Sequence, residues 1–213
     1  MTATVKICGL REPEHVDTAV DAGAGLTGFV FFAPSPRNVS IAEAAALTAR
    51  VPADVCKVAL CVDADDDFLA DIVKNAGVGA LQLHGAESIP RVAHIKNTFG
   101  LPVIKAVPIS SAEDIAAARV YEAHADMLLF DAKPPRDATR PGGNAESFDW
   151  TLLQGLSFRV PWLLAGGLDA SNVAEALKIS GAPMVDVSSG VEDAPGHKSS
   201  RKIREFIAAV KAA

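Results

Sequence analysis

The sequence predicts an α/β fold, a single (β/α)8 TIM barrel in which parallel strands alternate with helices. Short runs rich in Val, Ile and Leu alternate with Ala-rich stretches of helical spacing along the 213 residues, which is the pattern of a parallel sheet. There are eight such runs, whereas a doubly wound open sheet more often has fewer strands and a GxGxxG motif after the first. We therefore expect one domain over residues 1–213.

The positions of the elements follow from these runs. We expect strands at 4–8, 26–31, 56–61, 79–83, 102–106, 126–130, 161–165 and 184–188. We expect helices at 13–22, 41–50, 66–75, 88–98, 111–120, 149–155, 170–180 and 199–211. In such a barrel, functional residues lie where each strand ends and the next loop begins.

The composition narrows the class of partner. Apolar residues make up 49% of the chain, charged residues 22%, and the formal net charge is −6, so there is material for a large core and no sign of disorder. The scattered basic residues argue against a nucleic-acid or membrane partner, because both need a concentrated basic surface. Cys8, Cys56 and Cys61 lack CxxC spacing, and no signal peptide or long apolar span is present, which predicts a reduced, cytoplasmic chain.

The first expected strand ends in VKICGL, with a cysteine at its last position. Side chains alternate along a strand, so Lys6 and Cys8 share one face, and we expect that face to point into the barrel while Val5 and Ile7 face the helices. Because the eighth strand adjoins the first in a closed barrel, we expect Asp186 to pair with Lys6. Most free cysteines are small buried hydrophobic residues, and a catalytic role depends on ionisation of the thiol, so Cys8 alone leaves both interpretations open.

The second expected strand leads into FFAPSPRNVS, where Arg37 follows two prolines that fix its position. A guanidinium placed there can hold a planar carboxylate through two parallel hydrogen bonds. The alternative is a solvated surface charge, the commoner fate of a loop arginine. The prolines favour a binding role.

Three helices carry start signals. Ser40 precedes Glu43 by three residues, and Ser111 precedes Asp114 in the same way, which places acceptors where the first helical N–H groups need them. The acidic run at 63–67 has no matching histidines and precedes a helix, where negative charge is favourable. We interpret it as a solvated helix start rather than a metal site.

The fourth expected strand ends in LQLHG, where Gln82 and His84 share a face. A lone histidine at a strand end is more often a hydrogen-bonded structural group than a catalyst. We therefore leave His84 outside the catalytic set.

The sixth expected strand ends in an acid, Asp131, which aligns with Met127 and Leu129. We expect this carboxylate at the barrel mouth, above an apolar layer. A helix cap or a loop carboxylate is the alternative, but the long loop AKPPRDATRPGGNAES separates Asp131 from the next helix. Such length indicates a lid or binding loop, and Gly142 and Gly143 give it a flexible point.

The last two units end in LLAGGL and VDVSSGVE. Consecutive glycines and serines expose backbone N–H groups to an anion, and barrels often hold phosphate in the loops after strands seven and eight. Either cluster alone could be an ordinary turn, but two on adjacent units favour phosphate. The expected phosphate-binding residues are Gly166, Gly167, Ser188, Ser189 and Gly190.

Together these segments resemble the phosphoribosylanthranilate isomerase family of tryptophan biosynthesis, along essentially the whole chain. The resemblance rests on VKICGL, FFAPSPR, LQLHG, LLFDAK, PGGN, LLAGGL and DVSSGVE in this order. It implies that Cys8 is the general base, that Asp131 is the general acid, and that Arg37 contacts the anthranilate carboxylate. It also places Gly143 in a substrate-binding loop, which here reads GGNA where many members have GGTG.

The resemblance implies an Amadori rearrangement of N-(5-phosphoribosyl)anthranilate to 1-(2-carboxyphenylamino)-1-deoxyribulose 5-phosphate. An acid protonates the furanose ring oxygen so that the ring opens to an iminium, and a base then takes the proton from ribose carbon 2. Because the substrate nitrogen serves as the electron sink, we expect no metal and no cofactor. The expected partner is a small-molecule phosphosugar, with the protein a monomer or a homodimer.

Other functions fit parts of the sequence. A ribulose-phosphate 3-epimerase would share the phosphate loops, but its chemistry needs paired aspartates and metal-binding histidines at strand ends, which this sequence does not offer. A phosphosugar-binding barrel without catalysis would act as a sensor or scaffold, and Cys8 and Asp131 argue against it. Activity on a related substrate of the histidine pathway remains open.

Overall fold

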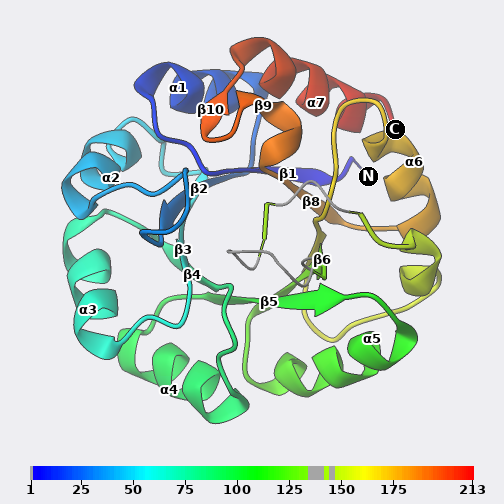
Figure 1. Cartoon of the computed structure of the whole chain (residues 1–213), viewed down its shortest axis with the longest axis horizontal. Helices are drawn as coiled ribbons and strands as arrows, with labels where there is room; N and C mark the ends of the chain where they lie inside the picture. The colour runs from blue at the N-terminus through cyan, green and yellow to red at the C-terminus, as the bar shows by residue number, and fades with distance from the viewer. Residues whose placement is uncertain (1, 134–141, 144–146) are drawn as a thin grey trace.

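The predicted TIM barrel is confirmed. The computed structural model describes residues 2–133, 142–143 and 147–213, and in them eight parallel strands pair in chain order and close through β1 and β8 (Figure 1). The strands are β1 Thr4–Cys8, β2 Leu26–Phe31, β3 Cys56–Cys61, β4 Ala80–Leu83, β5 Val103–Ile109, β6 Met127–Ala132, β7 Trp162–Leu164 and β8 Met184–Val187. All eight lie within a few residues of their expected positions.

Helices surround the barrel (Figure 1). The α-helices are α1 Pro13–Ala22, α2 Ile41–Thr48, α3 Asp66–Asn75, α4 Ile89–Phe99, α5 Ala112–Ala118, α6 Val173–Ser180 and α7 Ser200–Ala212, and the 3-10 helices are η1 Arg119–Ala123, η2 Trp150–Leu153 and η3 Ser189–Val191. The expected starts of α2 and α5 are confirmed, because Ser40 and Ser111 each form a capping box. The acidic run opens α3, where the Asp65 carboxylate accepts the Phe68 N–H.

The α-helix expected at 149–155 is wrong. This segment forms only the short 3-10 helix η2. The Asp149 carboxylate accepts the N–H of Thr151 at one end, and Gly155 has a φ of +70° just beyond the other. The segment is therefore capped at both ends and is too short for an α-helix to propagate.

A small hairpin between β8 and α7 was not expected from the sequence. Its strands, β9 Glu192–Ala194 and β10 His197–Lys198, pair antiparallel. Gly196 turns between them with a φ of +83°, and a Cβ added there would lie 2.5 Å from the carbonyl oxygen of Pro36. The hairpin therefore packs closely on the loop that carries Arg37.

The core has two layers, as the alternation in β1 predicts. Val5 and Ile7 point outward and belong to the large apolar cluster between barrel and helices, whereas Lys6 and Cys8 are buried on the opposite face. A smaller cluster fills the barrel and consists of Leu26, Val58, Ala80, Ile104, Ala106, Leu129, Leu163 and Ala165. Among the described residues, no helix combines the length and apolar character needed to cross a bilayer.

Candidate active site

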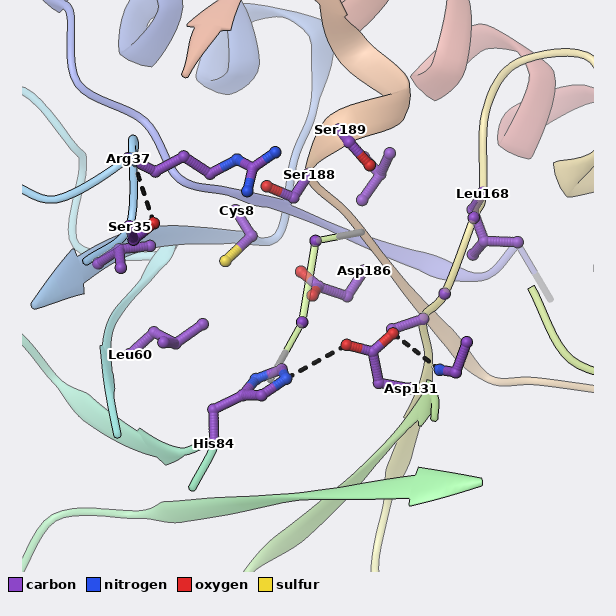
Figure 2. Close-up of a pocket in the computed structure, with 18 of the residues that line it drawn as sticks. Cys8, Ser35, Arg37, Leu60, His84, Asp131, Leu168, Asp186, Ser188 and Ser189 are labelled. Carbon is purple, nitrogen blue, oxygen red and sulfur yellow. Dashed lines mark hydrogen bonds and ion pairs between the residues drawn. The ribbon is translucent and has the colours of Figure 1, made fainter. Parts of the chain in front are cut away.

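A pocket opens at the mouth of the barrel, where the carboxyl ends of the strands meet (Figure 2). It encloses about 780 Å³ of empty space, part of it open to solvent. The predicted site residues in its wall are Cys8, Arg37, Asp131, Gly143, Gly166, Gly167, Ser188 and Ser189. The fold thus brings these strand-end residues into one cavity.

Cys8 ends β1 with its side chain directed into this pocket (Figure 2). Its neighbour on β2 is Gly28, where an added Cβ would lie 2.9 Å from Cys8 Sγ and 3.1 Å from Cys8 Cα. Real Cβ atoms do not approach sulfur so closely, so glycine at this register position leaves the thiol its space. Lys6, two residues earlier on β1, lies on the same inward face, one layer deeper in the barrel than Cys8.

Lys6 and Asp186 form the expected ion pair. The Nζ of Lys6 lies 2.8 Å from Oδ1 of Asp186, and strand register sets the two residues opposite each other on β1 and β8. Lys6 is fully buried. Burial alone would lower the pKa of Lys6, but the charges and hydrogen bonds of Asp186 and Cys8 together outweigh burial and raise that pKa, so the ammonium stays charged.

These neighbours do not lower the pKa of the Cys8 thiol below its ordinary value. Burial raises the pKa of the Cys8 thiol above its ordinary value, and the Lys6 ammonium only partly offsets that effect. Asp186 raises the pKa further, and Lys198 lowers it. The thiol is therefore the main form at neutral pH in the absence of ligand.

Asp131 lies on β6 across the pocket from Cys8 (Figure 2). Its side chain is nearly buried, its Oδ1 accepts the N–H of Ala132 at 2.9 Å, and its Oδ2 lies 3.2 Å from Nε2 of His84. A Cβ added to Gly142 would lie 2.7 Å from Oδ2, so the backbone at this glycine packs directly on the carboxyl group. The predicted position of Asp131, above the apolar layer at the mouth, is confirmed.

His84, which the sequence reasoning left outside the catalytic set, lies in the pocket wall beside Asp131. Gln82 approaches its other ring nitrogen, with Nε2 2.9 Å from Nδ1. The tautomer decides which nitrogen donates, and His84 and Asp131 share a hydrogen bond where Nε2 or the carboxyl group carries the proton. The signal was present in the sequence, since LQLHG places both polar residues on the inward face of β4.

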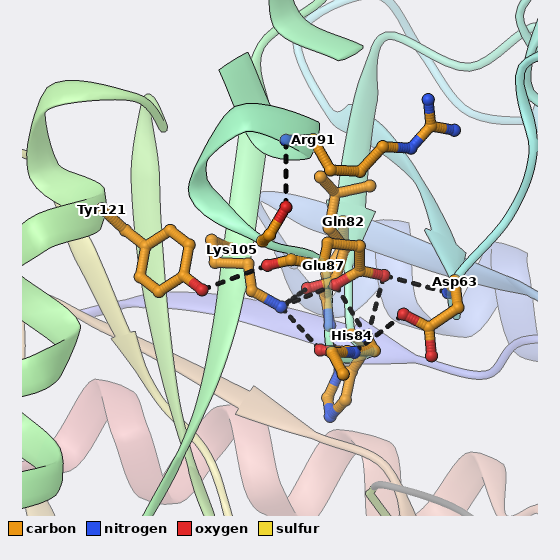
Figure 3. A network of polar contacts seen from close by, with 11 residues as sticks. Asp63, Gln82, His84, Glu87, Arg91, Lys105 and Tyr121 are labelled. Carbon is orange, nitrogen blue, oxygen red and sulfur yellow. Dashed lines mark hydrogen bonds and ion pairs between the residues drawn. The ribbon is translucent and has the colours of Figure 1, made fainter. Parts of the chain in front are cut away.

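The loop that follows His84 is held by a buried ion pair (Figure 3). Lys105 Nζ on β5 lies 2.6 Å from Oε2 of Glu87 and donates to the carbonyl of Gly85 at 2.7 Å. The Glu87 carboxylate accepts the N–H groups of Gly85 and Asp63 in turn. These contacts fix the backbone next to His84, and so fix the ring against Asp131.

Arg37 is buried and not solvated. Its Nε and Nη2 donate to Oε1 and Oε2 of Glu192 at 2.7 and 2.8 Å, a bidentate pair. The third nitrogen, Nη1, would lie 2.5 Å from a Cβ added to Gly143, so this edge of the guanidinium lies against the loop glycine at the pocket wall. Asn144 and Ala145, which carry the departure from GGTG, lie outside the described residues.

Glu192 and Lys198 are two further residues that the sequence did not point to. Lys198 Nζ lies 2.8 Å from Oε1 of Glu192 and also donates to the carbonyl and the hydroxyl of Ser188. Burial opposes ionisation of Glu192, but hydrogen bonds from Arg37 and the charge of Lys198 outweigh it and lower its pKa to about 2. Burial lowers the pKa of Lys198 to about 8, because Glu192 offsets it only in part.

The two predicted phosphate loops contact each other at the pocket wall. Gly166 and Gly167 have φ values of +86° and +62° after β7, and Asn172 holds this turn by donating to the carbonyl of Gly167. Gly190 lies behind the wall, where an added Cβ would lie 1.9 Å from the carbonyl oxygen of Leu168. Only glycine allows the loops to approach this closely.

Comparison with known proteins identifies a protein family with this sequence. Residues 5–209 match the model of the N-(5'-phosphoribosyl)anthranilate (PRA) isomerase family. The N-(5'-phosphoribosyl)anthranilate isomerase of Paramagnetospirillum magneticum is 53% identical, covering 99% of this chain and 98% of the relative. That of Rhodopseudomonas palustris is 51% identical over the full length of both.

Solved structures agree with the sequence comparison. Phosphoribosyl anthranilate isomerase from Thermotoga maritima superposes with a TM-score of 0.89 at 34% identity, over 99% of this chain and 100% of the other. A phosphoribosyl anthranilate isomerase in complex with reduced 1-(o-carboxyphenylamino)-1-deoxyribulose 5-phosphate has a TM-score of 0.85 at 32% identity, with the same coverage.

Proposed function

The chain belongs to the N-(5'-phosphoribosyl)anthranilate isomerase family and catalyses the isomerase step of tryptophan biosynthesis, and from this premise we propose how its own residues carry out the reaction. The substrate is N-(5-phosphoribosyl)anthranilate, and the product is 1-(2-carboxyphenylamino)-1-deoxyribulose 5-phosphate. Asp131 acts as the general acid and Cys8 as the general base. One observation carries these roles: both side chains point into one pocket, from β6 and β1, between a phosphate cradle and a buried arginine.

The two ends of the substrate are held by different parts of the wall. Its phosphate binds at the loops after β7 and β8, through Gly166, Gly167 and the run 188–190, where glycine turns set backbone N–H groups side by side. Its anthranilate carboxylate binds at Arg37 beside Gly143. Two fixed ends place the ribose ring between acid and base, which lowers the entropic barrier of the reaction.

Asp131 begins the reaction. It donates a proton to the furanose ring oxygen, the bond between ribose carbon 1 and that oxygen breaks, and the nitrogen lone pair forms the iminium. The His84 ring, 3.2 Å from Oδ2 of Asp131, can return a proton to the carboxylate or stabilise it after donation. The packing of Gly142 on the same oxygen supports this role by limiting access of water.

Cys8 completes the reaction. The iminium acidifies carbon 2 of the ribose, the Cys8 thiolate takes the proton from it, and the electron pair moves to form an enolamine. The enolamine then gains a proton at carbon 1 and loses the hydroxyl proton at carbon 2, which gives the aminoketone. Lys6 and Lys198 are the cations that favour the thiolate against the burial of Cys8.

A cytoplasmic monomer or homodimer that binds neither nucleic acid nor membrane is part of the same proposal. The three free cysteines support a reducing compartment, and the net charge of −6 disfavours polyanionic partners. A solved relative from Thermotoga maritima is described as monomers generated from a dimeric enzyme, which is consistent with either state.

Loss of anthranilate-type fluorescence during conversion of phosphoribosylanthranilate generated in situ tests the proposal. We expect turnover by the wild type, and a fall by a factor of about 10² or more in Cys8→Ala and in Asp131→Asn, with circular dichroism unchanged. Near-normal turnover in either variant would remove that residue from the mechanism. Wild-type binding of the substrate without turnover would instead favour a phosphosugar-binding barrel.

A further inference from the structure

The β9–β10 hairpin connects the two ends of the pocket through Glu192 and Lys198. Glu192 is the first residue of β9 and Lys198 the last of β10, and the strands set them side by side. Both side chains are almost completely buried. Neither belongs to the pocket wall defined above, so any effect on the substrate acts through their partners.

Lys198 fixes the hydroxyl group of Ser188. An ammonium group has three N–H donors and no acceptor, and Lys198 Nζ has three partners: the Ser188 carbonyl at 2.9 Å, the Ser188 hydroxyl at 3.2 Å and Oε1 of Glu192 at 2.8 Å. The Ser188 oxygen must therefore accept from Lys198. Its own hydrogen is left to donate elsewhere, and Ser188 lines the pocket.

Glu192 fixes the orientation of Arg37. Its two oxygens bind the Nε and Nη2 edge of the guanidinium, which leaves the Nη1 edge at the side of Gly143 and the pocket. Oε1 of Glu192 is shared, since it accepts from both Arg37 and Lys198. A shift of this one carboxylate would move both cations.

Building on the proposed function, we propose that Glu192 and Lys198 form a positioning pair that aligns both substrate grips at once. Lys198 turns the Ser188 hydroxyl into a donor towards the substrate phosphate, and Glu192 presents the Nη1 edge of Arg37 to the substrate carboxylate. The pair sets the distance between the two ends that the pocket accepts, and so selects a phosphosugar with a carboxylate at its other end.

The charges around the pair fit this role. Arg37, Lys198 and Glu192 together carry a net positive charge at neutral pH, because the pKa of Lys198, lowered by burial to about 8, leaves the ammonium mostly protonated. Cys8 also faces Lys198 closely enough to interact with it electrostatically. Binding of a phosphate dianion nearby adds to the stabilisation of this cation.

A double-mutant cycle with Lys198→Met and Ser188→Ala tests the first grip. We expect each single variant to raise KM, and the inhibition constant of inorganic phosphate, about tenfold, and Lys198→Met also to lower kcat, because it removes a cation that favours the Cys8 thiolate. Because Lys198 acts through the Ser188 hydroxyl, we expect Ser188→Ala to add less than about twofold in the Lys198→Met background. Equal effects of Ser188→Ala in both backgrounds would overturn the proposal.

Glu192→Gln tests the shared carboxylate with two probes, inorganic phosphate and anthranilate as separate inhibitors. We expect both inhibition constants to rise, whereas a change in neither, or in only one, would show that the grips are independent. Lys202→Met is the matched control, because Lys202 contacts the hairpin at the Glu192 carbonyl and at Asp193, away from the shared carboxylate. We expect the KM of this variant to lie within about twofold of the wild-type value.

Failure of this proposal and failure of the proposed function give different results. A wild type without turnover would contradict the isomerase mechanism, but calorimetry with inorganic phosphate would still report the effect of Lys198→Met on Ser188. If Glu192→Gln does not fold, the Lys198–Ser188 cycle decides alone. A lower melting temperature in Lys198→Met with unchanged KM and phosphate binding would reduce Lys198 to a structural residue.

Discussion

Cys8 shows how a single residue can be placed by sequence yet have its chemistry set by distant neighbours. Its position at the end of β1 and its inward direction follow from local alternation, and both were predicted. Of the charged groups that act on its ionisation, Lys6 lies two residues away on β1, whereas Asp186 on β8 and Lys198 on β10 lie far along the chain. The direction of the pKa shift of Cys8 could not be predicted from the sequence. Burial, which raises the pKa, has a larger effect than the neighbouring cations, which lower it.

The pH dependence of Cys8 alkylation by iodoacetamide follows from that shift. Burial raises the pKa of the Cys8 thiol. We therefore expect the alkylation rate to keep increasing as the pH rises above about 8.5, the pKa of free cysteine. Peptide mass spectrometry separates Cys8 from Cys56 and Cys61, and free glutathione is the control. A rate that reaches its plateau near neutral pH would contradict the buried, raised thiol.

His84 and Glu192 are two residues beside the site that the sequence reasoning did not include. His84 was left out because a lone strand-end histidine is more often a structural group than a catalyst, and its partner Asp131 is 47 residues further along. Glu192 lies 155 residues from Arg37 and belongs to a strand of only three residues. Such short strands give no periodic pattern, so only the folded barrel brings these pairs together.

At the scale of elements, the strands were predictable and the short connections were not. Each of the eight strands is rich in apolar residues and can be recognised locally. The expected helix at 149–155 has helical composition, but its caps limit it to η2. The β9–β10 hairpin depends on Gly196 packing against Pro36, a tertiary contact that no local pattern encodes.

The junction of β1 with β8 depends on the buried pair Lys6–Asp186. We expect Lys6→Met to lower the free energy of unfolding by about 3–5 kcal/mol, because it leaves the Asp186 carboxylate buried without its partner. The double variant Lys6→Met/Asp186→Leu should recover most of that loss, since no uncompensated charge remains. Urea denaturation followed by circular dichroism measures both.

An exposed ion pair provides the control for this comparison. Arg50 and Asp17 pair at the surface with side chains about half exposed, so Arg50→Met should lower the free energy of unfolding far less than Lys6→Met does. If Lys6→Met cost as little as Arg50→Met, the Lys6–Asp186 pair would not be what holds the first and last strands together.

At the scale of the whole molecule, barrel closure turns separate sequence motifs into one site. Strand ends from both halves of the chain line one pocket, with Cys8 and Asp131 facing each other and the phosphate loops beside them (Figure 2). We propose that the phosphate loops and Arg37 hold the two ends of the substrate between acid and base. In this mechanism Asp131 opens the ring and Cys8 removes the proton from carbon 2.

The most direct test of that assignment is the kinetic isotope effect of substrate carrying deuterium at ribose carbon 2, measured in Cys8→Ser and Asp131→Asn. In Cys8→Ser we expect a primary isotope effect at least as large as in the wild type, because proton removal limits the rate. In Asp131→Asn we expect an effect close to one, because ring opening becomes limiting. The reverse pattern, a large effect in Asp131→Asn and none in Cys8→Ser, would contradict the proposed roles.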